Sequence, residues 1–476
     1  MAQPTHAGPV ASVGAPTVGE LSNRPETGSR RMATPFRPGV DVTIRRPWGC
    51  LNVLGVAAWT LFGSGAIAPS APPGDRGAIE RPCRAMNYIV VSPDGPRDGG
   101  DFGPHTPGTK TSGIQEALNF AKAHRKDVYI AGGAMPKAFG NGVVYHLSET
   151  LRVPWFQDFR LDGGEYVLNA TFTSGDVVVI DSQMNCRMKF GLIVSPSDGA
   201  VVRLKPQTKG PDNVAVIVAS TFEFNALVGA GSVFPDGRKA PKGIGLFLDA
   251  SEAAIVNNTI HATEIIACER GLLLSCGPNP GPRRTGIIDN RIEVPFAHLC
   301  ATHLQIGDES GAGVFRNTIR ANINSEGVPG SAGVRIFGRN NLFTLGFAQT
   351  APQMNIVFER PARDNLITVL EMPNGFTNRA EHPTNRIQPL SPAGLNAPTP
   401  EFPSSGVRVM NRYPYTIQAM FVSPGRVTRW MLTEADGTTH TFVGGVSVGQ
   451  SITLEPGDAV AFVYEQPPVW RWRALR

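Results

Sequence analysis

Short stretches of alternating apolar and polar residues fill the second half of the chain, and a repeated asparagine step follows several of them. The step is Asn, one variable residue, then Ile or Phe. It occurs at spacings of 32, 27, 24, 24 and 20 residues, beginning at Asn258, Asn290, Asn317, Asn341, Asn365 and Asn385. Repetition at such a period indicates a solenoid, in which each repeat forms one coil stacked on the next.

The step is typical of a corner followed by a strand. Asn tolerates the left-handed backbone that a tight corner requires, so we expect each Asn to adopt it. The apolar residue two positions later then starts a strand and points inward. Runs with alternate aliphatic residues precede the steps, at 245–249, 271–275, 303–307 and 333–337. No amphipathic helix of ten or more residues separates these runs, so helical repeats are excluded. The pattern predicts an all-β fold, a single-stranded right-handed parallel β-helix.

A helical pattern precedes the coils. Apolar residues at helical spacing predict a short amphipathic helix from about Ile114 to His124, which Thr111 or Ser112 can cap. The end of a β-helix exposes unpaired backbone and apolar side chains. We therefore expect this segment to be an N-terminal capping helix.

Composition divides the chain into segments. We expect a disordered extension over 1–49, an apolar signal-peptide-like segment over 50–71, the β-helix over 87–387, a proline-rich linker over 388–405 and a C-terminal β-sandwich over 406–476. Residues 1–49 are rich in small residues and Pro, which disfavours a packed core. The final segment has short strands at the spacing of a small sandwich.

The segment 50–71 has the features of a cleaved leader. Arg45 and Arg46 precede an uncharged apolar stretch, and Ala68-Pro69-Ser70 offers a small-residue cleavage site. A single membrane anchor is the alternative, since about 18 apolar residues just span a bilayer. With the leader removed, we expect a secreted or cell-surface protein without stable membrane insertion.

Charge and cysteine content exclude some partners. The net charge is +5 and clustered basic runs are absent, so nucleic-acid binding has no electrostatic support. The six cysteines match no zinc motif, and no cofactor is expected. Two disulfide bridges are possible, Cys268–Cys276 and Cys276–Cys300. The alternative is that the thiols are unpaired, buried and stacked inside the coils. His298 and His303 flank Cys300, but strand alternation places the two rings on opposite faces, so no metal is expected.

The region of the predicted cap carries a family resemblance. The segments that carry it are Thr111-Ser112-Gly113-Ile114-Gln115-Glu116-Ala117-Leu118, Val128-Tyr129-Ile130-Ala131-Gly132-Gly133, Tyr145-His146-Leu147 and Leu151-Arg152-Val153-Pro154. Together they resemble the N-terminal cap of the pectate-lyase-like right-handed β-helix superfamily, which includes polygalacturonases, pectate lyases and phage tailspikes. The resemblance covers roughly residues 87–390. It implies the fold, whereas the superfamily's functions range from lyases and hydrolases to non-catalytic adhesins. The polygalacturonase Asp-rich and Gly-His-Gly signatures are absent from the sequence, as is a calcium-binding Asp cluster.

The asparagine step also predicts which polar residues share a column. The third residue after each Asn points outward, and successive coils lie about 4.8 Å apart. Three adjacent coils therefore present His261, Glu293 and Arg320 side by side. Such a trio could supply an acid or base, an orienting carboxylate and an anion clamp for an acidic glycan. The alternative is a solvated ladder of ion pairs.

Three tryptophans of the final segment are candidates for sugar binding. Trp430, Trp470 and Trp472 lie in the predicted sandwich, and aromatic faces stack on sugar rings. The alternative is that they pack the core of a small domain.

The sequence thus predicts an extracellular polysaccharide-binding protein with a lateral groove. Whether it cleaves its ligand as a polysaccharide lyase or glycoside hydrolase is left open. The competing class is a non-catalytic adhesin, a surface scaffold or a tailspike-like protein. An obligate homotrimer would favour the tailspike-like alternative.

Overall fold

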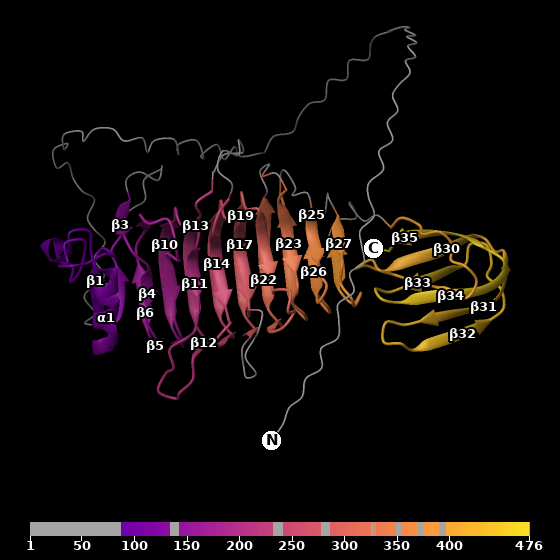
Figure 1. Ribbon diagram of the computed structural model, residues 1–476, viewed down its shortest axis with the longest axis horizontal. Coiled ribbons are helices and arrows are strands. Elements are labelled where there is room, and N and C mark those ends of the chain that lie inside the picture. Colours follow the sequence, from indigo (N-terminus) through magenta and orange to yellow (C-terminus); the bar gives the residue numbers. More distant parts are fainter. Residues whose placement is uncertain are drawn as a thin grey trace, which may run out of the picture. The chain divides into compact units, whose positions relative to one another are not determined.

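The computed structural model describes residues 87–133, 142–231, 241–277, 286–324, 328, 330–348, 354–369, 375–389 and 397–475. In these ranges the chain forms three parallel sheets followed by two antiparallel ones (Figure 1). The predicted extension at 1–49 and the leader-like segment at 50–71 lie outside the described ranges, as do Cys50 and Cys83. Within the described ranges, no helix is long and apolar enough to cross a membrane.

Three sheets, named A, B and C here, build the β-helix. Sheet A consists of β1 (Tyr88–Val91), β2 (Asp127–Ile130), β6 (Arg160–Gly163), β10 (Arg187–Val194), β13 (Thr221–Val228), β16 (Thr259–Ile266), β19 (Arg291–His298), β22 (Thr318–Asn324), β24 (Leu342–Phe347), β26 (Leu366–Val369) and β28 (Arg386–Pro389), with β3 (Val143–Leu147) and β7 (Tyr166–Ala170) alongside. Sheet B consists of β4 (Leu151–Val153), β8 (Val178–Ile180), β11 (Ala200–Leu204), β14 (Ile244–Asp249), β17 (Arg270–Ser275), β20 (Thr302–Ile306), β23 (Ala332–Ile336), β25 (Met354–Phe358) and β27 (Phe376–Asn378). Sheet C consists of β5 (Phe156–Gln157), β9 (Gln183–Met184), β12 (Val216–Val218), β15 (Ala254–Val256), β18 (Ile287–Ile288) and β21 (Val314–Phe315).

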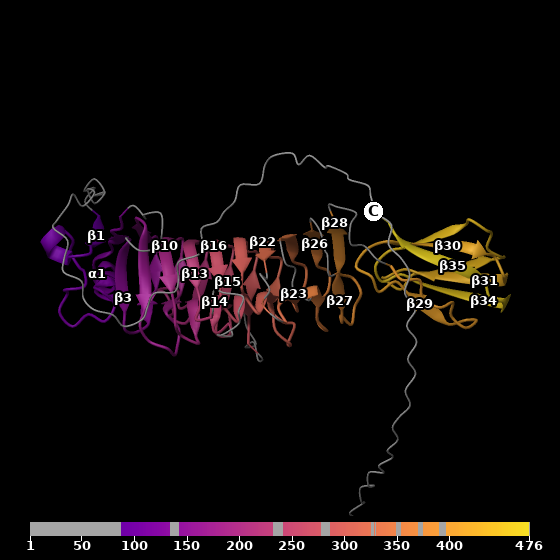
Figure 2. The same cartoon turned by 90° about the horizontal axis from the view of Figure 1, so that it is seen from above.

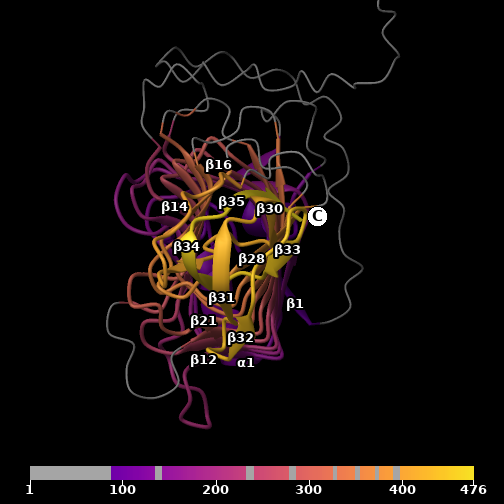
Figure 3. The same ribbon diagram turned by 90° about the vertical axis from the view of Figure 1, so that its right-hand side faces the viewer.

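Neighbouring strands in each sheet come from successive coils. In the central part of the stack the chain visits sheet C, then A, then B, as in β15, β16 and β17, before the next coil repeats the path. The pairings are parallel, for example β16 with β19 and β17 with β20. Figure 2 shows strands of sheet A side by side in sequence order, and Figure 3 shows the coils one behind another. The fold is a parallel β-helix, as predicted.

The asparagines of the repeated step form a buried ladder between sheets C and A. All six are buried. Asn317 Oδ1 accepts hydrogen bonds from the backbone N and the Nδ2 of Asn290, at 3.1 and 3.0 Å. In turn, Asn317 Nδ2 donates to Asn341 Oδ1 at 3.1 Å. The ladder satisfies backbone groups that a buried corner would otherwise leave unpaired.

The left-handed residue of this corner precedes the ladder asparagine, which corrects the expectation. Asn257, Asp289 and Arg316 have φ of 56°, 57° and 58°, and each comes directly before a ladder Asn. The sharp turn at the preceding residue carries the next side chain into the interior. The ladder position therefore selects Asn for its hydrogen bonds and not for its tolerance of positive φ.

The residue two places after each ladder Asn points into the core, as predicted. These side chains are in register from coil to coil, and each is at most 3% exposed: Ile260, Ile292, Ile319, Phe343, Ile367 and Ile387. They form a continuous apolar column inside sheet A. Burial of such columns is the main favourable contribution to the fold.

The predicted helix is α1 (Ile114–His124), which follows a short 3₁₀ turn at Gly95–Asp98. Its start differs in detail from the expectation, because Gly113 adopts a left-handed conformation at the cap. Thr111 Oγ1 nevertheless accepts a hydrogen bond from the backbone N of Gln115 at 3.1 Å. The apolar face of α1 is fully buried and packs on β1, β2 and β4, so the helix covers the first coils.

The C-terminal domain has two antiparallel sheets and its own core. One sheet has the order β29 (Arg408–Met410), β34 (Ala459–Gln466), β31 (Arg426–Thr433) and β32 (Thr439–Val443), and the other the order β33 (Ser451–Leu454), β30 (Ile417–Ser423) and β35 (Val469–Ala474). The sequence prediction missed β35, which carries two of the tryptophans. The described end of the predicted linker also packs on this domain, because Phe402 contacts its core and Trp470 Nε1 donates to the Pro400 carbonyl at 3.0 Å.

Four cysteines of the β-helix are buried thiols, and two of them, Cys268 and Cys300, lie at the corner between sheets A and B. Cys186, Cys268, Cys276 and Cys300 are free and buried, so neither of the two bridges left open by the sequence is formed. Cys268 and Cys300 lie in register on successive coils. Their mutual contact, together with burial, raises the pKa of the Cys268 thiol well above its ordinary value. The thiols therefore pack as small apolar groups.

A buried histidine makes the stability of the β-helix depend on pH. Both ring nitrogens of His303 lie 3.0 Å from backbone carbonyl oxygens, those of Ala332 and Asn324. Burial lowers the pKa of His303 below its ordinary value of 6.5, and it outweighs these two contacts. Below pH 6.5 the unfolded chain binds a proton that the folded ring resists. The free energy of unfolding should therefore decrease as the pH is lowered below 6.5, and it should level off once the pH is below the lowered pKa of the folded state.

This dependence can be measured by urea unfolding between pH 8 and pH 5. We expect His303→Gln to reduce the slope of unfolding free energy against pH, whatever its effect on stability at pH 8. His105→Gln is the matched control, because His105 is an exposed residue of the loop that precedes α1. Identical slopes for the wild type and His303→Gln would contradict the prediction.

Candidate functional site

The structure brings the predicted trio together on the outer face of sheet A. His261 on β16, Glu293 on β19 and Arg320 on β22 are direct neighbours in the strand register. Glu293 lies between the other two, with its Oε2 3.7 Å from His261 Nδ1 and its Oε1 3.6 Å from an Arg320 guanidinium nitrogen. The side chains of His261, Glu293 and Arg320 are 37%, 30% and 70% exposed, so all three can reach a ligand.

The column extends to two earlier coils that the sequence prediction missed. Lys189 on β10 lies opposite Glu223 on β13 in the strand register, and Glu223 lies opposite His261 on β16 in the same way. The signal was hidden because these coils carry Cys186 and Ser220 at the ladder position in place of Asn. The third residue after Cys186 is Lys189, and the third residue after Ser220 is Glu223. Along the axis the charges therefore run from cation to anion, imidazole, anion and cation.

The contacts within this column are weak enough to be exchanged for a ligand. The ion pairs of Glu293 are longer than a hydrogen bond and partly exposed, and such pairs contribute roughly 0–1 kcal/mol. His261 Nε2 also lies 3.2 Å from Thr263 Oγ1. Glu293 can orient the imidazole through Nδ1, while Arg320 can bind a carboxylate. The arrangement can therefore hold an acidic group and transfer a proton beside it.

A second carboxylate and histidine pair lies further along the same strands. His298 Nε2 is 2.9 Å from Glu264 Oε1, and the His298 ring packs against Phe296 at 4.4 Å between centroids. His298 and His303 contact different groups, the carboxylate in one case and backbone carbonyls in the other. Over the ranges that the structure describes, no cluster of three or more metal-ligating side chains occurs.

Other carboxylates in the coils bond to turn backbone. Asp181 Oδ1 accepts hydrogen bonds from the backbone N of Ser182, Gln207 and Thr208, at 2.6, 2.7 and 2.8 Å. Burial alone would raise the pKa of Asp181, but these bonds and the Thr208 hydroxyl hold it below its ordinary value. Asp249 Oδ1 likewise accepts from the backbone N of Ser251. Both carboxylates thus hold the backbone of a turn.

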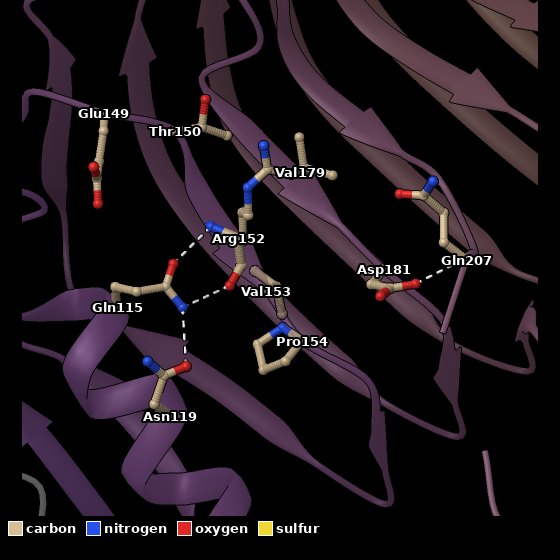
Figure 4. A pocket seen from close by; sticks show the side chains of 10 residues that line it. All are labelled: Gln115, Asn119, Glu149, Thr150, Arg152, Val153, Pro154, Val179, Asp181 and Gln207. Carbon is tan, nitrogen blue, oxygen red and sulfur yellow. Dashed lines mark hydrogen bonds between the residues drawn. The ribbon is translucent and has the colours of Figure 1, made fainter. Parts of the chain in front are cut away.

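A cavity of about 580 Å³ lies beside α1 at the start of sheet B (Figure 4). Its lining includes Gln115 and Asn119 from α1, Arg152 from β4, Val179 from β8, and Asp181 and Gln207 from the opposite side. Sequence reasoning did not identify it. No motif marks it, because its residues come from segments almost 100 positions apart and meet only in the folded coils.

The three tryptophans do not form an exposed platform. Trp470 and Trp472 are each 5% exposed and belong to the core of the C-terminal domain. Trp430 stacks on Phe442 with the ring centroids 3.9 Å apart. This placement agrees with the packing alternative, because neither Trp470 nor Trp472 presents an open face to a sugar in this structure.

Comparisons with known proteins do not assign the chain to a family. A scan against protein-family models finds no match, and a search of curated proteins finds no relative.

Proposed function

We propose that the protein binds an extracellular acidic polysaccharide along the outer face of sheet A, as a member of the pectate-lyase-like β-helix superfamily. The observation that carries the proposal is the in-register column from Lys189 to Arg320. Its residues recur at the strand spacing of about 4.8 Å, so they offer contacts at regular steps along a linear polymer. A parallel β-helix and the resemblance of its capped end support the family.

Within this column the trio is the proposed site of chemistry. Arg320 would bind a glycan carboxylate, and His261 would transfer a proton at the adjacent linkage. Glu293 would orient His261 and stabilise its protonated form. A hydrolase and a lyase both need such a proton transfer, and their products distinguish them: only a lyase leaves an unsaturated sugar.

The test is a panel of neutral and acidic polysaccharides incubated with the full-length protein. Ultraviolet absorbance reports unsaturated lyase products, and a reducing-end assay reports cleavage by either route. Retention on glycan columns reports binding. We expect retention of acidic glycans and cleavage of at least one. Retention without cleavage would remove the catalytic part, and neither retention nor cleavage would overturn the whole proposal.

The role of the carboxylate is tested by Glu293→Gln. We expect its turnover to fall by about 100-fold or more, because a neutral amide cannot stabilise the protonated imidazole. Glu269→Gln is the matched control, since Glu269 is an exposed carboxylate between β16 and β17 and lies outside the column. Wild-type turnover in Glu293→Gln would eliminate the trio as the site.

One observation favours a second candidate, a non-catalytic adhesin or scaffold. Glu293 contacts both of its neighbours in the column, as it would in a ladder whose role is to join coils. In that case Arg320→Gln would alter stability slightly and leave glycan retention unchanged. A homotrimer in sedimentation analysis would further favour the tailspike-like form of this candidate.

A further inference from the structure

The C-terminal domain has an open strand edge at β32. This strand is the last of the four-stranded sheet, next to β31, and all five of its residues are exposed (Figure 1). Just beyond it, Gly444 N donates to the Thr428 carbonyl at 3.0 Å. Because bonded pairs alternate along an antiparallel ladder, His440 and Phe442 are the residues of β32 that bond to β31.

The other three residues of β32 direct their backbone groups to the open side. They are Thr439, Thr441 and Val443. In the ranges that the structure describes, their N–H and carbonyl groups bond to no other backbone group. An edge of this kind is a ready template for another strand.

The edge of β32 lacks the usual protection against pairing. Edge strands are commonly blocked by lysine, proline, a bulge or a covering segment. Strand β32 contains neither Lys nor Pro, and it pairs with β31 without a register shift. By contrast, the edge strand β35 carries two arginines, and its Trp472 N donates to Thr399 Oγ1 at 2.9 Å.

The inner face of β32 is also incompletely covered. Phe442 lies opposite Trp430 in the register, stacks on it, and shares the face that contacts the core of the domain. The opposite sheet has one strand fewer, and Phe442 is left 40% exposed. A strand added beside β32 would cover this ring, so the edge and the exposed ring require the same kind of partner, an extended chain.

The charges at the two ends of β32 favour a second copy of this chain in the opposite direction. The exposed Asp436 lies in the turn before the strand, and the exposed Arg429 lies opposite Val443 at its far end. Two copies paired antiparallel therefore bring the acidic turn of each toward the arginine of the other. Parallel pairing would bring like charges together.

We propose that β32 pairs with β32 of a second copy around a twofold axis at Thr441. In this register Thr441 faces the partner's Thr441, and Thr439 faces the partner's Val443. Every backbone group on the open side then meets a partner, and the two sheets become one. The joint is remote in sequence from the column of sheet A and does not rest on glycan binding.

The test is sedimentation equilibrium of the full-length protein over a series of concentrations, in which the mass should rise toward that of a dimer. Thr441→Lys and Thr441→Glu should each weaken the dimer at least fivefold, because like charges then face each other across the axis. An equimolar mixture of the two variants should recover dimers, because opposite charges then meet. Thr318→Lys is the matched control, since Thr318 is an exposed threonine on β22.

Cysteine cross-linking tests the register independently of any charged variant. Bonded antiparallel pairs have Cα atoms about 5.5 Å apart, which a disulfide can bridge. With oxidised glutathione as the oxidant, Thr441→Cys should form cross-linked dimers. Thr439→Cys should do so only when mixed with Val443→Cys. The wild type reports the background from the native cysteines.

Three results would overturn the pairing. The first is a wild type that stays monomeric throughout the series. The second is association, as a dimer or a trimer, that Thr441→Lys and Thr441→Glu leave unchanged. The third is cross-linking of Thr439→Cys with itself as efficient as that of Thr441→Cys. Glycan retention and cleavage are measured separately, so failure of this joint and failure of the proposed function are distinguishable.

Discussion

Replacing Asn317 with Ala should lower the free energy of unfolding by about 3 kcal/mol or more. The change removes two hydrogen bonds accepted from Asn290 and those that Nδ2 donates to Asn341 and to the carbonyls of Ile287 and Phe315. Several partners are then left buried and unpaired, and each such group costs roughly 1–3 kcal/mol. Urea unfolding followed by circular dichroism measures the loss.

A matched control for this change lies on the surface of the next coil. Thr344 is exposed on β24, and Thr344→Ala should change stability by no more than about 0.5 kcal/mol. Asn317→Asp adds a second test, because it keeps an acceptor oxygen but loses the amide donor and buries a negative charge. It should be at least as damaging as Asn317→Ala at neutral pH. If either Asn317 variant were as stable as the wild type, the ladder would not have the structural role described here.

Phe343→Ala should destabilise the protein by about 3–5 kcal/mol, the usual cost of removing a buried aromatic ring. Phe343 is fully buried and lies in the inner column between Ile319 and Ile367. Both neighbours belong to other coils held by the same column, so they cannot close the space without breaking register. The cavity would therefore remain and add to the lost burial. Thermal unfolding at neutral pH provides the measurement.

The adjacent residue provides the control for Phe343. Leu342 precedes it on the same strand, points to the other face and is 43% exposed. Leu342→Ala should cost no more than about 0.5 kcal/mol. Similar losses for the two variants would show that the assigned inward and outward faces are incorrect.

The architecture could be predicted because one residue per coil has a fixed physical task. The repeated Asn and the Ile or Phe two places later marked the start of β16, β19, β22, β24, β26 and β28. The role of the Asn was predicted incorrectly, since its neighbour carries the left-handed backbone. A sequence shows that a corner recurs, but the choice between adjacent residues depends on hydrogen bonds between coils. Strand β35 was missed although Trp470 and Trp472 alternate with arginines at the strand period of two, because these tryptophans were considered only for sugar binding or core packing.

The candidate site was predictable only where the ladder gave a register. His261, Glu293 and Arg320 could be aligned by counting from Asn, and the structure places them as neighbours. Lys189 and Glu223 were missed because their coils lack that marker. No regular spacing in the sequence predicts the cavity at Arg152, because its walls come from a helix, strands and a turn that only packing brings together.

The asparagine ladder leaves the length of each coil nearly free. Its members are separated by as many as 32 and as few as 20 residues, yet the same hydrogen bond joins each one to the next. Loop closure costs rise only slowly with length, so insertions between ladder positions are tolerated. Selection can therefore lengthen or replace a loop between two ladder positions without changing the interior. A scaffold of this kind can acquire a new ligand through these loops while the spacing of its coils stays the same.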